Sequence, residues 1–230
     1  PPLTDFWAEF GPASTMTIPH ATSARPGARF CGDVWQKRDD MRRPVAEIYQ
    51  GMRDVSSMEE LQRAALMTGQ KLGFIASSDH MSTRAGYACV WAEGEPGESI
   101  DREPIFRALQ ARRCYGATAR IELVVRSGER WMGEDLAPAV DHPIDLEVTG
   151  TAPIERVDLW SNGEIVHTLR PSAAKERSTA PSRSLRATWT WPAPAPQSYL
   201  FAHVVQQDGN EAWSSPFFVG WAGWAESEGD

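Results

Sequence analysis

The chain has 230 residues, of which 41% are hydrophobic, so it is long enough to bury the core of one large domain or of two smaller ones. Its formal net charge of -8 argues against a general nucleic-acid binder, because neutralising phosphates requires a surplus of Lys and Arg. No apolar run reaches the roughly 20 residues that a membrane-spanning helix needs, and no signal peptide begins the chain, so we expect a soluble protein with the cytoplasm as the favoured compartment.

The charge is distributed unevenly along the chain. Residues 1–137 carry 17 Lys and Arg against 19 Asp and Glu, whereas residues 138–230 carry 6 against 12. The first part is therefore the better place for an anionic substrate. The spacing of Cys31, Cys89 and Cys114 matches no zinc knuckle or disulfide framework, and we expect three free thiols.

Two short apolar strands are expected early in the chain. The first, over residues 16–18, leads to His20, and the second, over residues 45–49, contains Glu47. A histidine just after a strand of an α/β unit is a candidate metal ligand. The C-terminal ends of the parallel strands in such a unit lie close together, so side chains from several strands can bind one ion. Glu47 is either a further ligand or, inside its strand, an ordinary hydrogen-bonded carboxylate.

The next segment carries the most suggestive polar pair. Ser57 and Glu60 fit a capping box, which predicts a helix, and residues 74–77 then form a short buried strand. Asp79 and His80 follow directly, and a carboxylate with an imidazole suits Zn²⁺, Mn²⁺ or Fe²⁺. The alternative is that Asp79 caps the following turn and His80 lies on the surface.

A second helix is expected from Asp101 to about Arg113, followed by a strand over residues 117–126. Arg112 and Arg113 could clamp a phosphate group of a substrate, although arginines at a helix C-terminus more often compensate the helix dipole. Short strands that each lead to a polar residue and a helix are typical of α/β barrels and doubly wound sheets.

After Pro138 the sequence changes to short, alternating strands without helices among them. Asn162-Gly163 is a strong hairpin signal, and 207–210 is a second turn. We therefore expect an immunoglobulin-like all-β sandwich over residues 138–225, followed by a flexible tail over 226–230. Its expected strands cover residues 144–148, 157–160, 165–169, 187–191, 199–206 and 216–219.

Three histidines and two tryptophans of the expected sandwich are more readily explained by packing than by binding or catalysis. We expect His142, His167 and His203 to be structural. Trp189 and Trp191 could form a platform for a sugar ring, although packing in a core or between domains is the more common use of tryptophan.

Several stretches, in this order, resemble the C-terminal part of a large bacterial family that is related to the polymerase and histidinol phosphatase (PHP) metal-dependent phosphoesterases and carries an appended β-sandwich. These stretches are IPHATSA (18–24), PVAEIYQG (44–51), GFIASSDH (73–80), RRCYGATARIELVVRSGERWMGE (112–134) and QQDGNEAWSSPFFV (206–219).

The resemblance implies an α/β fold in which residues 1–137 are the C-terminal part of a PHP-like (β/α) barrel. It implies two or three divalent metal ions (Zn, Mn or Fe) that activate water for hydrolysis of a phosphate ester. His20, Asp79 and His80 correspond to metal ligands, with Glu47 as a further candidate and Asp79 and His80 as catalytic residues. The substrate would be an anionic small molecule that Arg112 and Arg113 help to bind.

The sequence departs from the PHP pattern in three places. Asp79 and His80 are adjacent rather than separated by one residue, Ala119 replaces an acidic residue, and no His-x-His motif occurs. The missing ligands imply that an N-terminal half or a second chain completes the barrel. The competing interpretation is a non-enzymatic scaffold or binding module whose sandwich binds a partner or a glycan.

Overall fold

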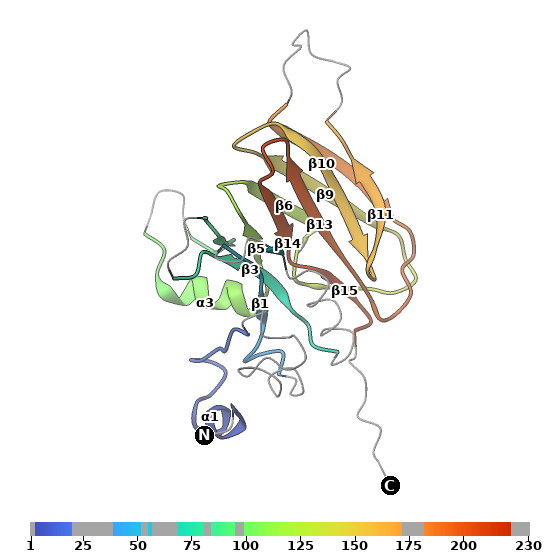
Figure 1. Cartoon of the computed structure of the whole chain (residues 1–230). Coiled ribbons are helices and arrows are strands. Elements are labelled where there is room, and N and C mark those ends of the chain that lie inside the picture. The colour runs from blue at the N-terminus through green and yellow to red at the C-terminus, as the bar shows by residue number, and fades with distance from the viewer. Residues whose placement is uncertain are drawn as a thin grey trace.

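The computed structural model describes residues 3–19, 39–51, 55–56, 69–80, 84–94, 99–171 and 182–221. This part of the chain contains fifteen strands and two helices. Strands dominate it, and Figure 1 shows most of them gathered in one body, with β1, β3 and the helices at its lower side.

The largest sheet has eight strands and forms the middle layer of the molecule. Its main path runs in the order β11-β10-β13-β14-β5-β4, and β15 pairs with β13 and with β8. The members are β4 (Tyr87–Val90), β5 (Cys114–Ala117), β8 (Asp135–Leu136), β10 (Ile154–Ser161), β11 (Glu164–Leu169), β13 (Ser198–Gln206), β14 (Glu211–Ser214) and β15 (Phe217–Val219).

A four-stranded sheet packs on one face of the middle layer and completes a β-sandwich. Its order is β12 (Ser184–Trp191), β9 (His142–Thr149), β6 (Glu122–Ser127) and β7 (Arg130–Trp131). Buried and more exposed residues alternate along β9, as expected for a strand with one face in a core and one in water. The side chains between the two sheets are mainly aliphatic, and we call them the aliphatic core; they include Leu123, Leu146, Leu159 and Leu200.

A small sheet covers the opposite face of the middle layer. It consists of β2 (Val55–Ser56), β1 (Val45–Gln50) and β3 (Gly73–Ser77), with β1 and β3 parallel. The side chains between this sheet and the middle layer are mostly aromatic, and we call them the aromatic core; they include Phe74, Tyr199, Phe201, Trp213 and Phe218. Because β13 is covered on both faces, eight of its nine residues are buried.

The close contact between β3 and the middle layer depends on two small residues. A Cβ atom on Gly116 would lie 2.9 Å from the carbonyl carbon of Ile75, so only glycine allows the backbones to approach this closely. Ser215 is fully buried; its hydroxyl accepts a hydrogen bond from the Phe74 N–H (3.0 Å) and donates one to the Cys114 carbonyl (2.6 Å). This hydroxyl gives the Phe74 N–H an acceptor and adds a second hydrogen bond to the Cys114 carbonyl, which also accepts one from the Ser215 backbone N–H at 3.2 Å.

The helices α1 (Leu3–Glu9) and α3 (Arg102–Gln110) lie on the side of the molecule away from the sandwich (Figure 1). Helix α3 connects β4 to β5, which are antiparallel neighbours. It buries Ala108, while Ile105 is 38% exposed.

The expected α/β fold with a partial PHP-like barrel is wrong. The fifteen strands form three sheets, and the only parallel pairs among the described residues are β1 with β3 and β15 with β8. The expected barrel helix joins antiparallel strands and is not a crossover between parallel ones. Local strand and helix patterns do not specify pairing partners, and the partners of β5 and β6 here are sandwich strands.

The expected β-sandwich is present, and each of its expected strands coincides with an observed one. At the hairpin between β10 and β11, Asn162 has φ 51° and Gly163 φ 89°, as the Asn-Gly signal requires. The strand expected at 117–126 is instead two elements, because β5 ends at Ala117 and β6 begins at Glu122.

The division at residues 137 and 138 stays a prediction. Strand pairing crosses it, since β5 pairs with β14 and β6 pairs with β9. The helix expected after Ser57 and the tail at 226–230 lie outside the described residues. In the described part of the chain, no helix is long and apolar enough to cross a membrane.

Candidate functional site

Parallel pairing of β1 and β3 brings the polar residues at their C-terminal ends together. In the register of this pair, Gln50 lies opposite Ser77. The Ser77 hydroxyl donates a hydrogen bond to the Glu47 carboxylate, and the Gln50 amide donates one to Asp79. We call this end of the two strands the rim.

The side chains of Asp79 and His80 lie in contact because the backbone at Asp79 has an unusual conformation. Asp79 has φ 62°, in the left-handed region, so the chain turns sharply after β3. Its Oδ1 atom accepts a hydrogen bond from the His80 backbone N–H (2.5 Å) and lies 2.6 Å from His80 Nδ1. The His80 side chain is 76% exposed. Both expected functions of the pair, metal binding and a surface turn, are compatible with this geometry.

The described residues alone do not make up the expected metal centre. No group of three or more His, Cys, Asp or Glu side chains in the described ranges could hold a metal ion. The Glu47 and Asp79 carboxylates accept hydrogen bonds from Ser77 and Gln50. His20 lies outside the described residues. Binding of divalent metal ions therefore stays a prediction.

The two arginines expected to bind substrate lie at the other end of β3. A Cβ atom on Gly73, the first residue of β3, would lie 2.9 Å from the Arg112 side chain, whereas Asp79 follows the last residue of the strand. Six residues of extended chain span roughly 20 Å. Arg112 is therefore not brought to the same site as Asp79 and His80.

Arg112 is held by structural contacts. Its Nε donates to the Gly133 carbonyl at 3.0 Å, and its guanidinium lies 5.8 Å from the centre of the Phe218 ring. Burial lowers the pKa of the Arg112 guanidinium, and the nearby carboxylates of Asp40 and Asp135 partly oppose this shift. Its neighbour Arg113 makes different contacts, described below.

A pocket of about 570 Å³ opens beside the rim, and we call it the rim pocket. Tyr49, which precedes Gln50 on β1, forms part of its wall. Most of the lining groups are hydroxyls, amides, carboxylates and a guanidinium. The residues that line it are Tyr49, Arg84, Ala85, Thr118, Asp208, Gly209, Asn210 and Glu211.

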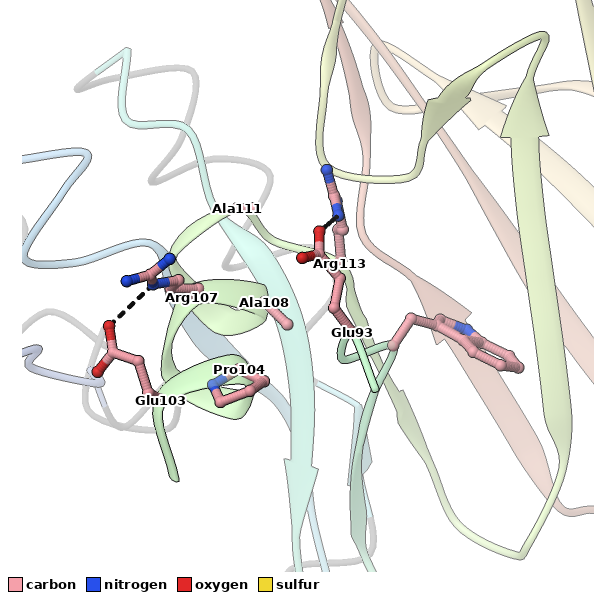
Figure 2. Close-up of a pocket in the computed structure, with 8 residues that line it drawn as sticks. Glu93, Glu103, Pro104, Arg107, Ala108, Ala111 and Arg113 are labelled. Atoms are coloured by element: carbon pink, nitrogen blue, oxygen red, sulfur yellow. Dashed lines mark hydrogen bonds and ion pairs between the residues drawn. The ribbon is translucent and has the colours of Figure 1, made fainter. Parts of the chain in front are cut away.

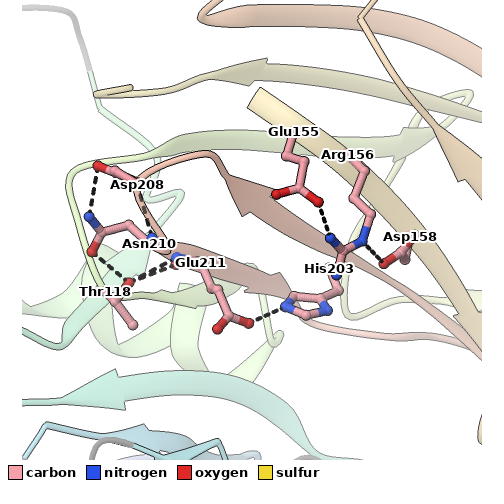
Figure 3. A network of polar contacts seen from close by, with 8 residues as sticks. All are labelled: Thr118, Glu155, Arg156, Asp158, His203, Asp208, Asn210 and Glu211. Atoms are coloured by element: carbon pink, nitrogen blue, oxygen red, sulfur yellow. Dashed lines mark hydrogen bonds and ion pairs between the residues drawn. The ribbon is translucent and has the colours of Figure 1, made fainter. Parts of the chain in front are cut away.

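A hydrogen-bonded turn between β13 and β14 fixes one wall of the rim pocket (Figure 3). Asp208 accepts hydrogen bonds from the Asn210 backbone N–H (3.1 Å), from the Asn210 side-chain amide (2.9 Å) and from Gln206 Nε2 (3.0 Å). Thr118 donates to Asn210 Oδ1 at 3.0 Å and accepts from the Glu211 N–H at 2.9 Å. The polar groups of this wall are therefore held in place before any ligand arrives.

The carboxylates of this wall have distinct environments. Burial raises the pKa of Asp208, but the hydrogen bonds from Asn210 and Gln206 outweigh it, so the pKa lies below its usual value. Glu211 Oε2 lies 2.5 Å from His203 Nε2, and His203 stacks on Trp213 with ring centres 5.3 Å apart. Asp208 is thus held in its charged form at neutral pH.

Tyr49 connects the rim pocket to the aromatic core. Its ring stacks on Trp213 at 6.0 Å between centres. Burial raises the pKa of the Tyr49 hydroxyl; the positive charge of Arg84 opposes this shift and the negative charge of Glu211 adds to it. The phenol therefore stays neutral at physiological pH and can both donate and accept hydrogen bonds.

The sequence predicts the turn at residues 207–210 but indicates no function for it. A turn of Asp, Gly and Asn is a general surface feature, and nothing in its sequence places it near Tyr49 or Thr118. Only the pairing of β14 with β5 brings Glu211 beside Thr118. The signal that could have found the site is the concentration of hydrogen-bonding side chains in that turn.

The remaining histidines and tryptophans make packing contacts. His142 bonds to the Ala137 carbonyl (2.7 Å), and the His167 ring stacks on Trp189 with centres 5.3 Å apart. Trp191 is buried, with 5% of its surface exposed. Trp189 and Trp191 face the aliphatic core and do not form an open platform for a sugar.

No family model matches the chain. Two similar proteins are uncharacterized proteins of chlamydiae. One, from Chlamydia pneumoniae, is 32% identical over 128 residues, which cover 51% of this chain and 21% of that protein. The other, from Chlamydia trachomatis, is 26% identical over 192 residues, which cover 74% of this chain and 30% of that protein. This chain thus corresponds to less than a third of their length.

Two solved structures are also similar, at low scores that carry no functional argument. Structures of fibronectin(III)-like modules of Clostridium thermocellum CbhA match with 17% identity and a TM-score of 0.29, covering 43% of this chain and 94% of the module. A lytic polysaccharide monooxygenase of Jonesia denitrificans matches with 15% identity and a TM-score of 0.25, covering 54% of this chain and 75% of that one.

The expected relationship to the PHP enzymes is contradicted. The chain matches no PHP family, and the described residues form β-sheets instead of the barrel on which such enzymes build their metal centre. The expected classification as a hydrolase or phosphoesterase was based on that relationship, so it is wrong as well.

Proposed function

We propose that this chain is a binding module of a longer protein and that the rim pocket holds a hydroxyl-rich ligand of the carbohydrate class. The observation that carries the proposal is the wall of fixed donors and acceptors at residues 208–211, in a pocket of about 570 Å³. A sugar hydroxyl both donates and accepts hydrogen bonds, so it suits a lining that mixes carboxylate, amide, hydroxyl and guanidinium groups.

The scaffold supports this function because the wall needs little reordering on binding. Asn210 and Asp208 bond to each other, and Thr118 anchors both Asn210 and Glu211 to β5. Restraining side chains in advance lowers the entropy cost of association. Tyr49 is held by its stacking on Trp213 and is only 6% exposed, so it closes the inner end of the pocket without moving on binding.

The size of the related proteins is consistent with a modular role. The chain covers 21% of one chlamydial relative and 30% of another. A β-sandwich that has its own core and presents a polar pocket on its edge is suited to bind a ligand for the rest of such a protein. The alternative, a scaffold that contacts a partner protein, requires no ligand in the rim pocket.

The test is a glycan microarray with the chain, followed by calorimetric titration of the saccharides that bind. We expect Asn210→Ala and Glu211→Gln to weaken binding at least about tenfold, because each removes hydrogen bonds to the ligand. Asp145→Asn, on the outer face of the four-stranded sheet, is the control and should bind as the unmodified chain does. If no saccharide binds, or if the pocket variants bind as well as the control, the proposal is wrong.

A further inference from the structure

A second cleft lies between α3 and the segment that follows β4, at the opposite end of β5 from the rim pocket (Figure 2). Its volume is about 350 Å³. We call it the α3 cleft. Its charged lining residues are Glu93, Glu103, Arg107 and Arg113.

Arg113 is the central charged group of the α3 cleft, and its hydrogen-bonding capacity is only partly used. Its Nη1 lies 3.1 Å from Glu93 and its Nη2 lies 3.4 Å from Glu134. The Nε atom is buried and has no hydrogen-bond partner in the described part of the chain. A buried N–H without a partner is costly, so the contacts of the described residues do not fully satisfy the Arg113 guanidinium.

Glu93 is a weakly held partner of Arg113. The Glu93 side chain is 87% exposed, whereas that of Arg113 is 29% exposed. Exposed ion pairs contribute little, because water solvates the separated charges and ordering the side chain costs entropy. The carboxylate of a ligand can therefore replace that of Glu93 and accept a charge-assisted hydrogen bond from Nη1 of Arg113.

Half of the residues that line the cleft are apolar, namely Trp91, Pro104, Ala108 and Ala111. Trp91 is fixed by a hydrogen bond from its indole N–H to the Leu123 carbonyl (3.0 Å) and by contact with Trp131 at 5.7 Å between ring centres. Pro104 of α3 lies on the facing side (Figure 2). These surfaces suit a ligand that has an apolar body next to its carboxylate.

We propose that the α3 cleft binds an apolar carboxylate, whose charged group takes the place of Glu93 on Arg113. Two sources share this chemistry: a free organic acid and the C-terminal residue of a peptide. The inference is independent of the rim pocket, since the two sites have no lining residue in common.

The experiment is an NMR titration of the chain with N-acetyl-phenylalanine and, as a matched probe without the carboxylate, N-acetyl-phenylalanine amide. The acid should shift the resonances of Trp91, Ala108 and Arg113 saturably, and the amide should not. A peptide that ends in phenylalanine, compared with the single residue, distinguishes the two sources: tighter binding of the peptide indicates a peptide C-terminus, and equal binding indicates an organic acid.

Variants provide the decisive contrast. Arg113→Gln should weaken binding of the acid at least about tenfold. Glu93→Gln should strengthen it by up to about fivefold, because it removes the internal competitor; a purely structural role of the pair predicts no gain. Arg130→Gln, which removes a different partner of Glu134, is the control. Binding of the amide as tightly as the acid, or no gain in Glu93→Gln, would overturn the proposal, and both tests remain valid if Arg113→Gln does not fold.

Discussion

The two faces of the eight-stranded sheet are buried by different kinds of side chain. The aliphatic core is built mainly from Leu, Ile and Val side chains of two sheets. Along strands such as β9, these buried residues alternate regularly with more exposed ones. The aromatic core contains buried polar atoms without hydrogen-bond partners among the described residues, namely the indole N–H groups of Trp160 and Trp213. We infer that the aliphatic core supplies most of the free energy of folding. The aromatic core contributes less, and its main role is to hold β1 and β3, which carry the rim, against the eight-stranded sheet.

The largest expected effect is on the aliphatic core. Leu146→Ala removes a side chain with no exposed surface and should lower the free energy of unfolding by about 2–5 kcal/mol. Glu147→Gln changes the next residue, on the outer face of the same strand, and is the control; its exposed pair with Arg186 contributes at most about 1 kcal/mol. Urea unfolding of both variants measures the difference. Equal losses would show that the aliphatic core is not the main source of stability.

The next prediction concerns the approach of β3 to the middle layer. Gly116→Ala places a Cβ atom about 2.9 Å from the backbone of Ile75 and should cost about 1–3 kcal/mol, because the small sheet must shift. Gly94→Ala, where the new atom meets only ordinary contact at 3.6 Å, is the matched control and should change stability by less than about 0.5 kcal/mol. Thermal unfolding distinguishes them, and similar melting temperatures would contradict the proposed contact.

A pair of tyrosines compares the two faces directly. The Tyr115 hydroxyl, in the aliphatic core, donates to the Ile121 carbonyl at 2.9 Å and lies 3.4 Å from the Leu123 N–H, so Tyr115→Phe should cost about 1–3 kcal/mol. Tyr199→Phe removes a hydroxyl of the aromatic core whose contact is a weaker one, with the Gly163 backbone, and should cost less, at most about 1 kcal/mol. Chemical denaturation of both variants tests this, and a larger loss for Tyr199→Phe would reverse the comparison.

The smallest expected effect appears at alkaline pH. Burial raises the pKa of the Cys114 thiol from 9.0 to about 12, so the folded protein holds this proton more tightly than the unfolded chain. The stabilisation is fully present below pH 9 and is lost as the pH rises towards 12, by about 1.4 kcal/mol per pH unit.

Cys114→Ser removes this thiol with little change of shape. Between pH 9 and 10 the variant should lose about 1 kcal/mol less stability than the unmodified chain, measured by denaturation at each pH. Cys89, whose pKa is also raised by burial, contributes equally to both proteins and leaves the difference unchanged. Parallel pH profiles would show that Cys114 is not protected by the fold.

Local sequence patterns are sufficient to predict most of the strands and turns of this chain. The alternation of residues in β9, the Asn-Gly turn at 162–163 and the apolar runs of β1 and β3 each specify a strand or a turn through contacts between near neighbours. For this reason the sandwich was predicted with its strands in the right places. The sequence also placed Asp79 and His80 directly after β3, where the structure shows them in contact.

The pairing of the strands, and with it the set of polar groups that lie close together, depends on contacts between residues far apart in the sequence. The strand patterns of β4 and β5 are equally compatible with a barrel and with a sandwich, and the choice depends on partners more than 90 residues away, such as Glu211 for Thr118. The same long-range pairing separated Arg112 from Asp79 and placed Asp208 beside Tyr49. Local sequence encodes hydrogen bonds and burial periodicity, whereas the sites depend on how three sheets stack, which short-range patterns do not contain.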